Sequence, residues 1–216
     1  MSSLRAALSF ILALTFAGPE LARAAPEVKD ARPRIVVFGD SLSAGFGADP
    51  GQSFPDYLQK DLDRLGYRYR VVNQGVSGDT TTGGLARIEE AVEEKPAVAI
   101  LELGGNDGLR GVPVESTKAN LENMIERLQK AGCKVLLAGM TLPPNYGPEY
   151  IKQFQAMYRD LARARRLPLI PFLLSDVVFQ SPKLGLIQAD GIHPTAKGNE
   201  IVARTVLKKL APMLRK

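Results

Sequence analysis

The stretch Arg34-Ile-Val-Val-Phe-Gly-Asp-Ser-Leu-Ser-Ala-Gly-Phe-Gly47 holds the clearest structural signal in the chain. Ile35 to Phe38 are four consecutive apolar residues, mostly β-branched, which is typical of a strand covered on both faces. The glycine-rich turn that follows places Ser41 just beyond the end of this strand, where α/β folds bind their ligands. Taken alone, Ser41 is also compatible with a simple turn residue or a helix N-cap.

The rest of the chain alternates between apolar strands and amphipathic helices. This alternation predicts an α/β fold in which a five-stranded parallel sheet, joined by right-handed crossovers, carries helices on both faces. Prolines interrupt the last strand, so we expect it at an edge of the sheet. The expected strands are 35–38, 69–72, 98–103, 134–140 and 167–172, and the expected helices are 54–65, 82–94, 116–131, 149–166 and 194–214.

Three turns and one late segment carry residues suited to acyl transfer. The carboxyl ends of parallel strands meet at one edge, so the turns with Ser41, Gly78 and Asn106 should lie together, beside Asp190 and His193. A serine hydroxyl is a weak nucleophile until a base takes its proton, and His193 is the only histidine in the chain. Asp190, three residues earlier, can orient the imidazole. A backbone carbonyl could do so instead, which leaves open whether Asp190 is essential.

An oxyanion hole is the second requirement of acyl transfer, because the tetrahedral intermediate carries a negative oxygen. The backbone N–H groups of Ser41 and Gly78 and the side-chain amide of Asn106 are the candidate donors. Singly, Gly78 and Asn106 are equally typical of ordinary turns. Their placement after successive strands is what favours a catalytic site.

A glycine-flanked loop, residues 108–113, directly follows Asn106. We hypothesise that it moves to cover an acyl chain, with residues of the Pro-rich loop 141–148 forming the opposite wall. An ordinary exposed connector is the alternative. The predicted substrate-binding residues, all from these two loops, are Leu109, Val112, Leu142, Pro143 and Tyr146.

The first 24 residues have the pattern of a secretory signal peptide. Arg5 precedes a mostly apolar run of about a dozen residues, too short to span a bilayer, and Ala22-Arg-Ala24 offers a cleavage site. We therefore expect residues 25–216 to form a single exported domain, periplasmic or secreted, without stable membrane insertion. Removal of the leader lowers the formal net charge from +5 to +4, and the scattered basic residues do not indicate nucleic-acid binding.

Metal and cysteine chemistry find little support in the composition. Cys133, the only cysteine, begins an apolar strand and is interpreted as a small core residue. A metal site would have to draw on aspartates from different turns, with one histidine and one cysteine available. The candidate ligands are Asp40, Asp79, Asp107 and Asp190.

At this point the motifs can be compared with a known family. Gly39-Asp-Ser-Leu42, Ser77-Gly-Asp-Thr80, Gly105-Asn-Asp107 and Asp190-x-x-His193 resemble the four motif blocks of the GDSL, or SGNH, hydrolases. Further segments, such as 101–111, look like the bacterial periplasmic thioesterase/lysophospholipase/arylesterase subgroup. The resemblance implies a three-layer flavodoxin-like fold and a metal-free, cofactor-free acyl hydrolase. It assigns nucleophile, triad and oxyanion roles to Ser41, Asp190, His193, Gly78 and Asn106.

The sequence therefore favours a serine esterase that hydrolyses carboxylic esters and thioesters, including lysophospholipids, acyl thioesters and aryl esters. We expect a monomer that acts on a small-molecule or lipid ester. A carbohydrate ester deacetylase with the same triad would need a small polar pocket, whereas the loops here are apolar. A non-catalytic ligand-binding module is the third possibility, but no phosphate-binding glycine motif follows the first strand.

Overall fold

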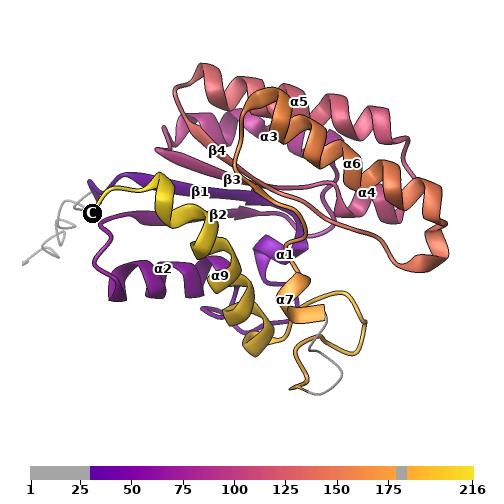
Figure 1. Ribbon diagram of the computed structural model, residues 1–216. Helices are drawn as coiled ribbons and strands as arrows, with labels where there is room; N and C mark the ends of the chain where they lie inside the picture. The colour runs from indigo at the N-terminus through magenta and orange to yellow at the C-terminus, as the bar shows by residue number, and fades with distance from the viewer. Residues whose placement is uncertain (1–29, 179–183) are drawn as a thin grey trace, which may run out of the picture. The chain divides into compact units, whose positions relative to one another are not determined.

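The computed structural model describes residues 30–178 and 184–216 of the chain (Figure 1). The predicted signal peptide, residues 1–24, lies outside the described residues. Residues 31–216 form one compact unit. Within the described ranges, no helix combines the length and the apolar character needed to cross a membrane.

Five parallel strands form the central sheet, as the sequence predicted. In the spatial order β2-β1-β3-β4-β5, the chain adds β2 on one side of β1 and then β3, β4 and β5 on the other side. This is a doubly wound order, and its topological switch point lies between β1 and β3. The predicted edge position of the last strand is confirmed. The strands are β1 (Arg34–Gly39), β2 (Arg70–Gly75), β3 (Val98–Glu102), β4 (Lys134–Ala138) and β5 (Leu169–Ile170).

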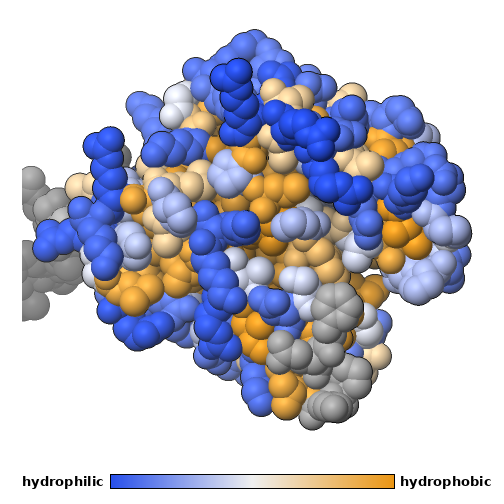
Figure 2. Space-filling view, in the orientation of Figure 1, coloured by the Kyte–Doolittle hydropathy of each residue, from blue (hydrophilic) through white to orange (hydrophobic). Residues whose placement is uncertain are grey.

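Helices cover both faces of this sheet, in the predicted three layers. In Figure 1, α2 (Phe54–Arg64) and α9 (Ala196–Leu210) lie below the sheet, and α3 (Thr81–Glu93), α5 (Val114–Lys130) and α6 (Pro148–Arg165) lie above it. Figure 2 shows mostly hydrophilic residues along the outer side of the upper layer, as amphipathic helices require.

Polar caps set where the main helices begin. Ser53 and Asp56 form a capping box before α2, and Thr80 and Thr195 cap α3 and α9 through their hydroxyls. Each cap satisfies backbone N–H groups that the first helical turn leaves unpaired.

The core lies on both sides of β1 and β3. Ile35 to Phe38 and Val98 to Leu101 are at most 1% exposed, which explains why these strands are continuous apolar runs. Cys133 is buried just before β4, and burial raises the pKa of its thiol to about 12, consistent with the predicted core role. The edge strand β2 is only partly buried.

Two segments interpreted as turns are short helices. Ser41 is the first residue of α1 (Ser41–Ala44), and the third predicted turn contains α4 (Gly105–Leu109). Residues 173–192, expected to be irregular, include α7 (Ser175–Val178). The last predicted helix is shorter than expected, and two 3₁₀ turns complete the described elements: η1 (Pro144–Tyr146) and η2 (Ala211–Met213).

Candidate active site

Ser41 follows β1 at the topological switch point of the sheet, which lies between β1 and β3. Asp40 caps α1, because its Oδ1 accepts the N–H of Leu42 at 3.0 Å. Position 39, directly before Asp40, must be glycine, since a Cβ on Gly39 would overlap the Ser43 hydroxyl and the Glu102 carboxyl group. This close packing turns the chain sharply from β1 into α1 and presents Ser41 at the carboxyl edge of the sheet.

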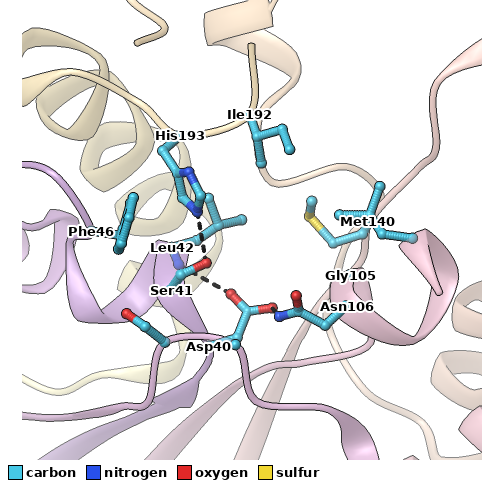
Figure 3. A pocket seen from close by; sticks show the side chains of 12 residues that line it. Asp40, Ser41, Leu42, Phe46, Gly105, Asn106, Met140, Ile192 and His193 are labelled. Carbon is cyan, nitrogen blue, oxygen red and sulfur yellow. Dashed lines mark hydrogen bonds between the residues drawn. The ribbon is translucent and has the colours of Figure 1, made fainter. Parts of the chain in front are cut away.

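Ser41, His193 and Asp190 form a continuous chain of hydrogen bonds. The Ser41 Oγ lies 2.8 Å from His193 Nε2, and His193 Nδ1 lies 2.7 Å from Asp190 Oδ2. Figure 3 shows the imidazole directly above the serine hydroxyl. The structure therefore brings together the three residues predicted as a triad, from positions 152 residues apart, in a geometry suited to proton transfer.

The second oxygen of Asp190 organises its own turn. Asp190 Oδ1 accepts the backbone N–H groups of Ile192 at 2.9 Å and His193 at 3.0 Å. Desolvation alone would raise the pKa of Asp190, but the bond from the imidazole and these two backbone bonds lower it to about 2. Asp190 is therefore a carboxylate at any pH where the protein would work.

Gln188 holds the histidine segment against the serine turn. Its backbone N–H donates to the His193 carbonyl at 2.8 Å. Its side-chain Nε2 donates to the carbonyls of Phe46 at 2.7 Å and Pro194 at 2.9 Å. A single side chain thus joins the turn after β1 to the segment that carries His193. The sequence analysis did not single out Gln188.

The two predicted oxyanion-hole residues outside the serine turn also lie at this edge. Gly78 has φ +82°, a left-handed conformation that favours glycine. Asn106 follows β3 in α4, and its Nδ2 donates to the Asp79 carbonyl at 2.9 Å and to Asp40 Oδ2 at 3.2 Å. Ser41, Gly78 and Asn106 line one cavity together.

Arg87 ties the Gly78 turn to the end of β1. Its Nε donates to Asp79 Oδ2 at 2.8 Å, and its Nη2 donates to the Gly39 carbonyl at 3.0 Å. The guanidinium also lies over the Phe38 ring, 4.0 Å from the ring centroid. Because this ion pair is mostly buried, it holds the segments on either side of the candidate oxyanion hole at a set spacing.

Two acidic side chains are buried directly beneath Ser41. Glu102 Oε2 accepts the Asp40 N–H at 3.2 Å and the Ser43 hydroxyl at 2.7 Å, so it bonds on both sides of the serine. Burial, together with the nearby charge of Asp40, raises the pKa of Glu102 well above its usual range. Burial also raises the pKa of Asp40, to about 6.

The cavity above Ser41 has a volume of about 190 Å³ and a largely apolar lining. Of the five predicted substrate-binding residues, Leu109 lines it. Other apolar lining residues were missed by the sequence analysis, although two of them, Phe46 and Ile192, stand close to the motifs in the chain. The lining comprises Asp40, Ser41, Leu42, Phe46, Ser77, Gly78, Gly105, Asn106, Leu109, Met140, Ile192 and His193.

The other predicted substrate-binding residues, Val112, Leu142, Pro143 and Tyr146, lie outside this lining. Leu142 is buried, and Pro143 is exposed. The Tyr146 hydroxyl donates to the Leu109 carbonyl at 2.8 Å, which ties the loop 108–113 to the Pro-rich loop. Val112 is held in the same way, because its carbonyl accepts the Tyr150 hydroxyl at 2.7 Å.

Comparison with known proteins identifies the family. The model of the GDSL-like Lipase/Acylhydrolase family matches residues 37–201, which is most of the chain. The chain belongs to this family. It is accordingly a hydrolase that acts on acyl esters.

Individual relatives of this GDSL-like acylhydrolase cover most of its length. It is 45% identical to esterase TesA of Pseudomonas aeruginosa over 83% of this chain and 89% of the relative. It is 35% identical to thioesterase 1/protease 1/lysophospholipase L1 of Escherichia coli strain K12, over 83% and 84%. A solved structure of the psychrotrophic esterase EstA from Pseudoalteromonas, inhibited by monoethylphosphonate, superposes with a TM-score of 0.77 at 30% identity, over 83% and 97%.

The aspartates that are candidate metal ligands in the sequence have other partners in this acylhydrolase. Asp79 pairs with Arg87, and the buried Asp107 accepts the Thr81 N–H at 2.8 Å, which connects α3 to α4. Within the described residues, no group of three or more His, Cys, Asp or Glu side chains is placed to hold a metal ion.

Proposed function

We propose that Ser41 is the nucleophile of a serine esterase, with His193 as general base and Asp190 as the residue that orients the imidazole. The observation that carries this proposal is the hydrogen-bonded chain Ser41 Oγ–His193 Nε2–Asp190, of which Ser41 and His193 line an apolar cavity. The inhibition of the related esterase EstA by a phosphonate is consistent with a nucleophilic mechanism in the fold.

In the first half-reaction, Ser41 Oγ attacks the carbonyl carbon of the ester while its proton passes to His193 Nε2. The new C–O bond yields a tetrahedral oxyanion. Nε2 then returns the proton to the leaving oxygen or sulfur as the bond from that atom to carbon breaks, which leaves an acyl-Ser41. In the second half-reaction, a water oxygen attacks the acyl carbon while a water proton passes to His193 Nε2. Nε2 then returns this proton to Ser41 Oγ as the bond from Oγ to the acyl carbon breaks, which releases the carboxylic acid and restores the serine.

The oxyanion would be bound by the N–H groups of Ser41 and Gly78 and by Asn106 Nδ2. In the resting structure, Asn106 donates one bond to the Asp79 carbonyl and a longer one to Asp40 Oδ2. The Asp79 bond orients the amide, and the N–H now directed at Asp40 is the one available to the substrate oxygen. The negative charge of Asp190 stabilises the imidazolium that forms at the same moment.

The substrates that suit this site best are esters and thioesters of apolar acyl groups, lysophospholipids among them. The apolar cavity lining supports this choice, as do the activities for which the relatives are named. We further infer that residues 1–24 direct export, so that the enzyme meets these esters in the periplasm or outside the cell. The basic start, apolar run and Ala22-Arg-Ala24 are the support for export.

Hydrolysis of p-nitrophenyl esters with acyl chains of two to sixteen carbons tests the proposal, with Ser41→Ala in parallel. We expect activity to peak at medium or long chains and to vanish in the variant. A peak at acetate would support a carbohydrate ester deacetylase instead. A folded protein without activity on any ester, and without labelling by a fluorophosphonate, would refute the proposed function.

A further inference from the structure

Phe46 is an exposed aromatic residue placed against the proposed general base. Of the large hydrophobic side chains that the structure describes, it has the largest exposed fraction, 51%. Its ring centroid lies 4.6 Å from that of the His193 imidazole, with the ring planes tilted by 42°. It also lines the cavity above Ser41.

The backbone around Phe46 is tightly constrained. Its N–H donates to the Ser41 carbonyl at 3.0 Å, and its own carbonyl accepts from Gln188 Nε2. It stands between Gly45 and Gly47, with φ +79° and +73°, conformations that larger residues rarely adopt. These backbone constraints keep the Phe46 ring half exposed to solvent. The ring therefore contributes less to stability through burial than the ring of a core phenylalanine does.

The chemistry of acyl transfer divides the cavity into two sides. His193 Nε2 must take a proton from Ser41 and then give it to the leaving atom, so the leaving group lies on the imidazole side of the scissile carbon. The acyl group, bonded to the same carbon, points away from the imidazole. In Figure 3, Phe46 and Met140 lie on opposite sides of the Ser41–His193 pair.

We propose that Phe46 forms a leaving-group site that selects esters whose leaving alcohol or phenol carries an aromatic ring. Such a ring stacks on the exposed Phe46 face while the leaving oxygen is within reach of Nε2. The acyl chain occupies the other side, along Leu109 and Met140. This inference rests on the proposed function, because it needs Ser41 and His193 to perform the transfer.

Its test compares leaving groups at a constant acyl chain. The substrates are phenyl, benzyl and ethyl butyrate, and kcat/KM is measured for the wild type, Phe46→Ala and Phe46→Tyr. This parameter reports acylation, the step in which the leaving group is still attached. Phe46→Ala should lower kcat/KM for the two aromatic esters roughly fivefold to tenfold, as expected for one lost aromatic pair, and for ethyl butyrate about twofold at most. Phe46→Tyr keeps the ring and should restore the preference.

A second series separates this role from an effect through His193. With phenyl esters of two to eight carbons, the loss in Phe46→Ala should be the same at every acyl length, whereas Leu109→Ala should lose activity increasingly with acyl length. Equal losses on all three butyrates, or a shifted pH profile common to them, would overturn the proposal and make Phe46 a residue that positions the imidazole. If the wild type hydrolysed none of these esters, the proposed function itself would be wrong.

Discussion

The carboxyl groups on the two sides of Ser41 lie in opposite environments. Beneath the serine, Asp40 and Glu102 are 3% and 0% exposed, and burial raises the pKa of both groups. Beside the serine, the Asp190 side chain is 36% exposed, and hydrogen bonds lower its pKa to about 2. Burial on one side shifts the carboxyl groups toward the protonated form, whereas hydrogen bonds on the other side favour the carboxylate.

This difference matches the different tasks of the two sides. The buried side sets the shape of the serine turn through dense packing and through hydrogen bonds to the backbone N–H groups of Asp40 and Leu42. The exposed side needs a full negative charge, because a positive imidazolium develops on His193 during each proton transfer. Burial and packing therefore position the Ser41 nucleophile, whereas a few hydrogen bonds position the His193 base.

The largest effects should come from the pair that joins the two sides. Ser41→Ala and His193→Ala should each lower kcat on the order of 10⁴-fold or more, because nucleophile and base act as a unit. Steady-state hydrolysis of p-nitrophenyl butyrate measures this loss. The double variant should be no worse than either single one, and additive losses would show that the two residues act independently.

Asp190→Asn should lower kcat by roughly 10³-fold to 10⁴-fold. Asp190 Oδ1 accepts two backbone N–H groups, so the amide oxygen of asparagine would take that place and its NH₂ would face His193 Nδ1. That arrangement favours the imidazole tautomer that protonates Nε2, which can no longer accept the serine proton. Asp190→Ala imposes no tautomer and should lose less than Asp190→Asn and less than His193→Ala. The reverse order would contradict the assigned role of Asp190.

Asn106→Ala should lower kcat roughly a hundredfold to a thousandfold, with a smaller change in KM, if its amide donates to the oxyanion. Measured kcat and KM for one ester are sufficient. A loss of only a few fold would show that Asn106 is a turn residue and does not donate to the oxyanion. Asn106→Asp, which keeps the size but replaces the NH₂ donor, serves as the matched variant and should be at least as impaired.

The smallest effect concerns stability on the buried side. Because the pKa of Glu102 is raised on folding, the folded protein keeps a proton that the unfolded chain releases above about pH 4.5, and stability falls as pH rises. Glu102→Gln cannot ionise and escapes this loss. The melting temperature of the variant minus that of the wild type should therefore increase between pH 5 and pH 8.

Asp190→Asn is the control for this pH trend. The pKa of Asp190 is about 2 in the folded protein against an ordinary value of 3.8, so its contribution to stability is fully present above pH 5 and declines only in more acidic solution. The difference in melting temperature between Asp190→Asn and the wild type should stay constant from pH 5 to pH 8. A flat profile for Glu102→Gln would mean that Glu102 ionises normally.

Much of the buried side could be predicted from the sequence. Strands β1 and β3 are covered on both faces, so their continuous apolar residues identify them without further information. The parallel arrangement then places Ser41, Gly78 and Asn106 at one edge. The pairing of β5 was harder to delimit: Pro168 and Pro171 flank it, and only Leu169 and Ile170 join the ladder, instead of the six residues predicted.

The cavity walls could be predicted only in part. The sequence indicates which loops are apolar, but not which side chains turn inward, because that depends on packing between distant segments. Leu142 was assigned to the acyl site, yet it packs beneath the loop at Gly108, where a Cβ would lie 2.6 Å from it. Phe46 was overlooked because a phenylalanine between glycines resembles a turn residue, and its neighbour His193 is far away in the chain.

The account depends most directly on Ser41 being the atom that receives the acyl group. Intact-mass and peptide mass spectrometry after reaction with a fluorophosphonate, on the wild type and on Ser41→Ala, measures this without choosing a substrate. We expect a single adduct on the peptide that contains Ser41 and none in the variant. An adduct on another residue, or active enzyme that hydrolyses esters while Ser41 stays unmodified, would contradict the account.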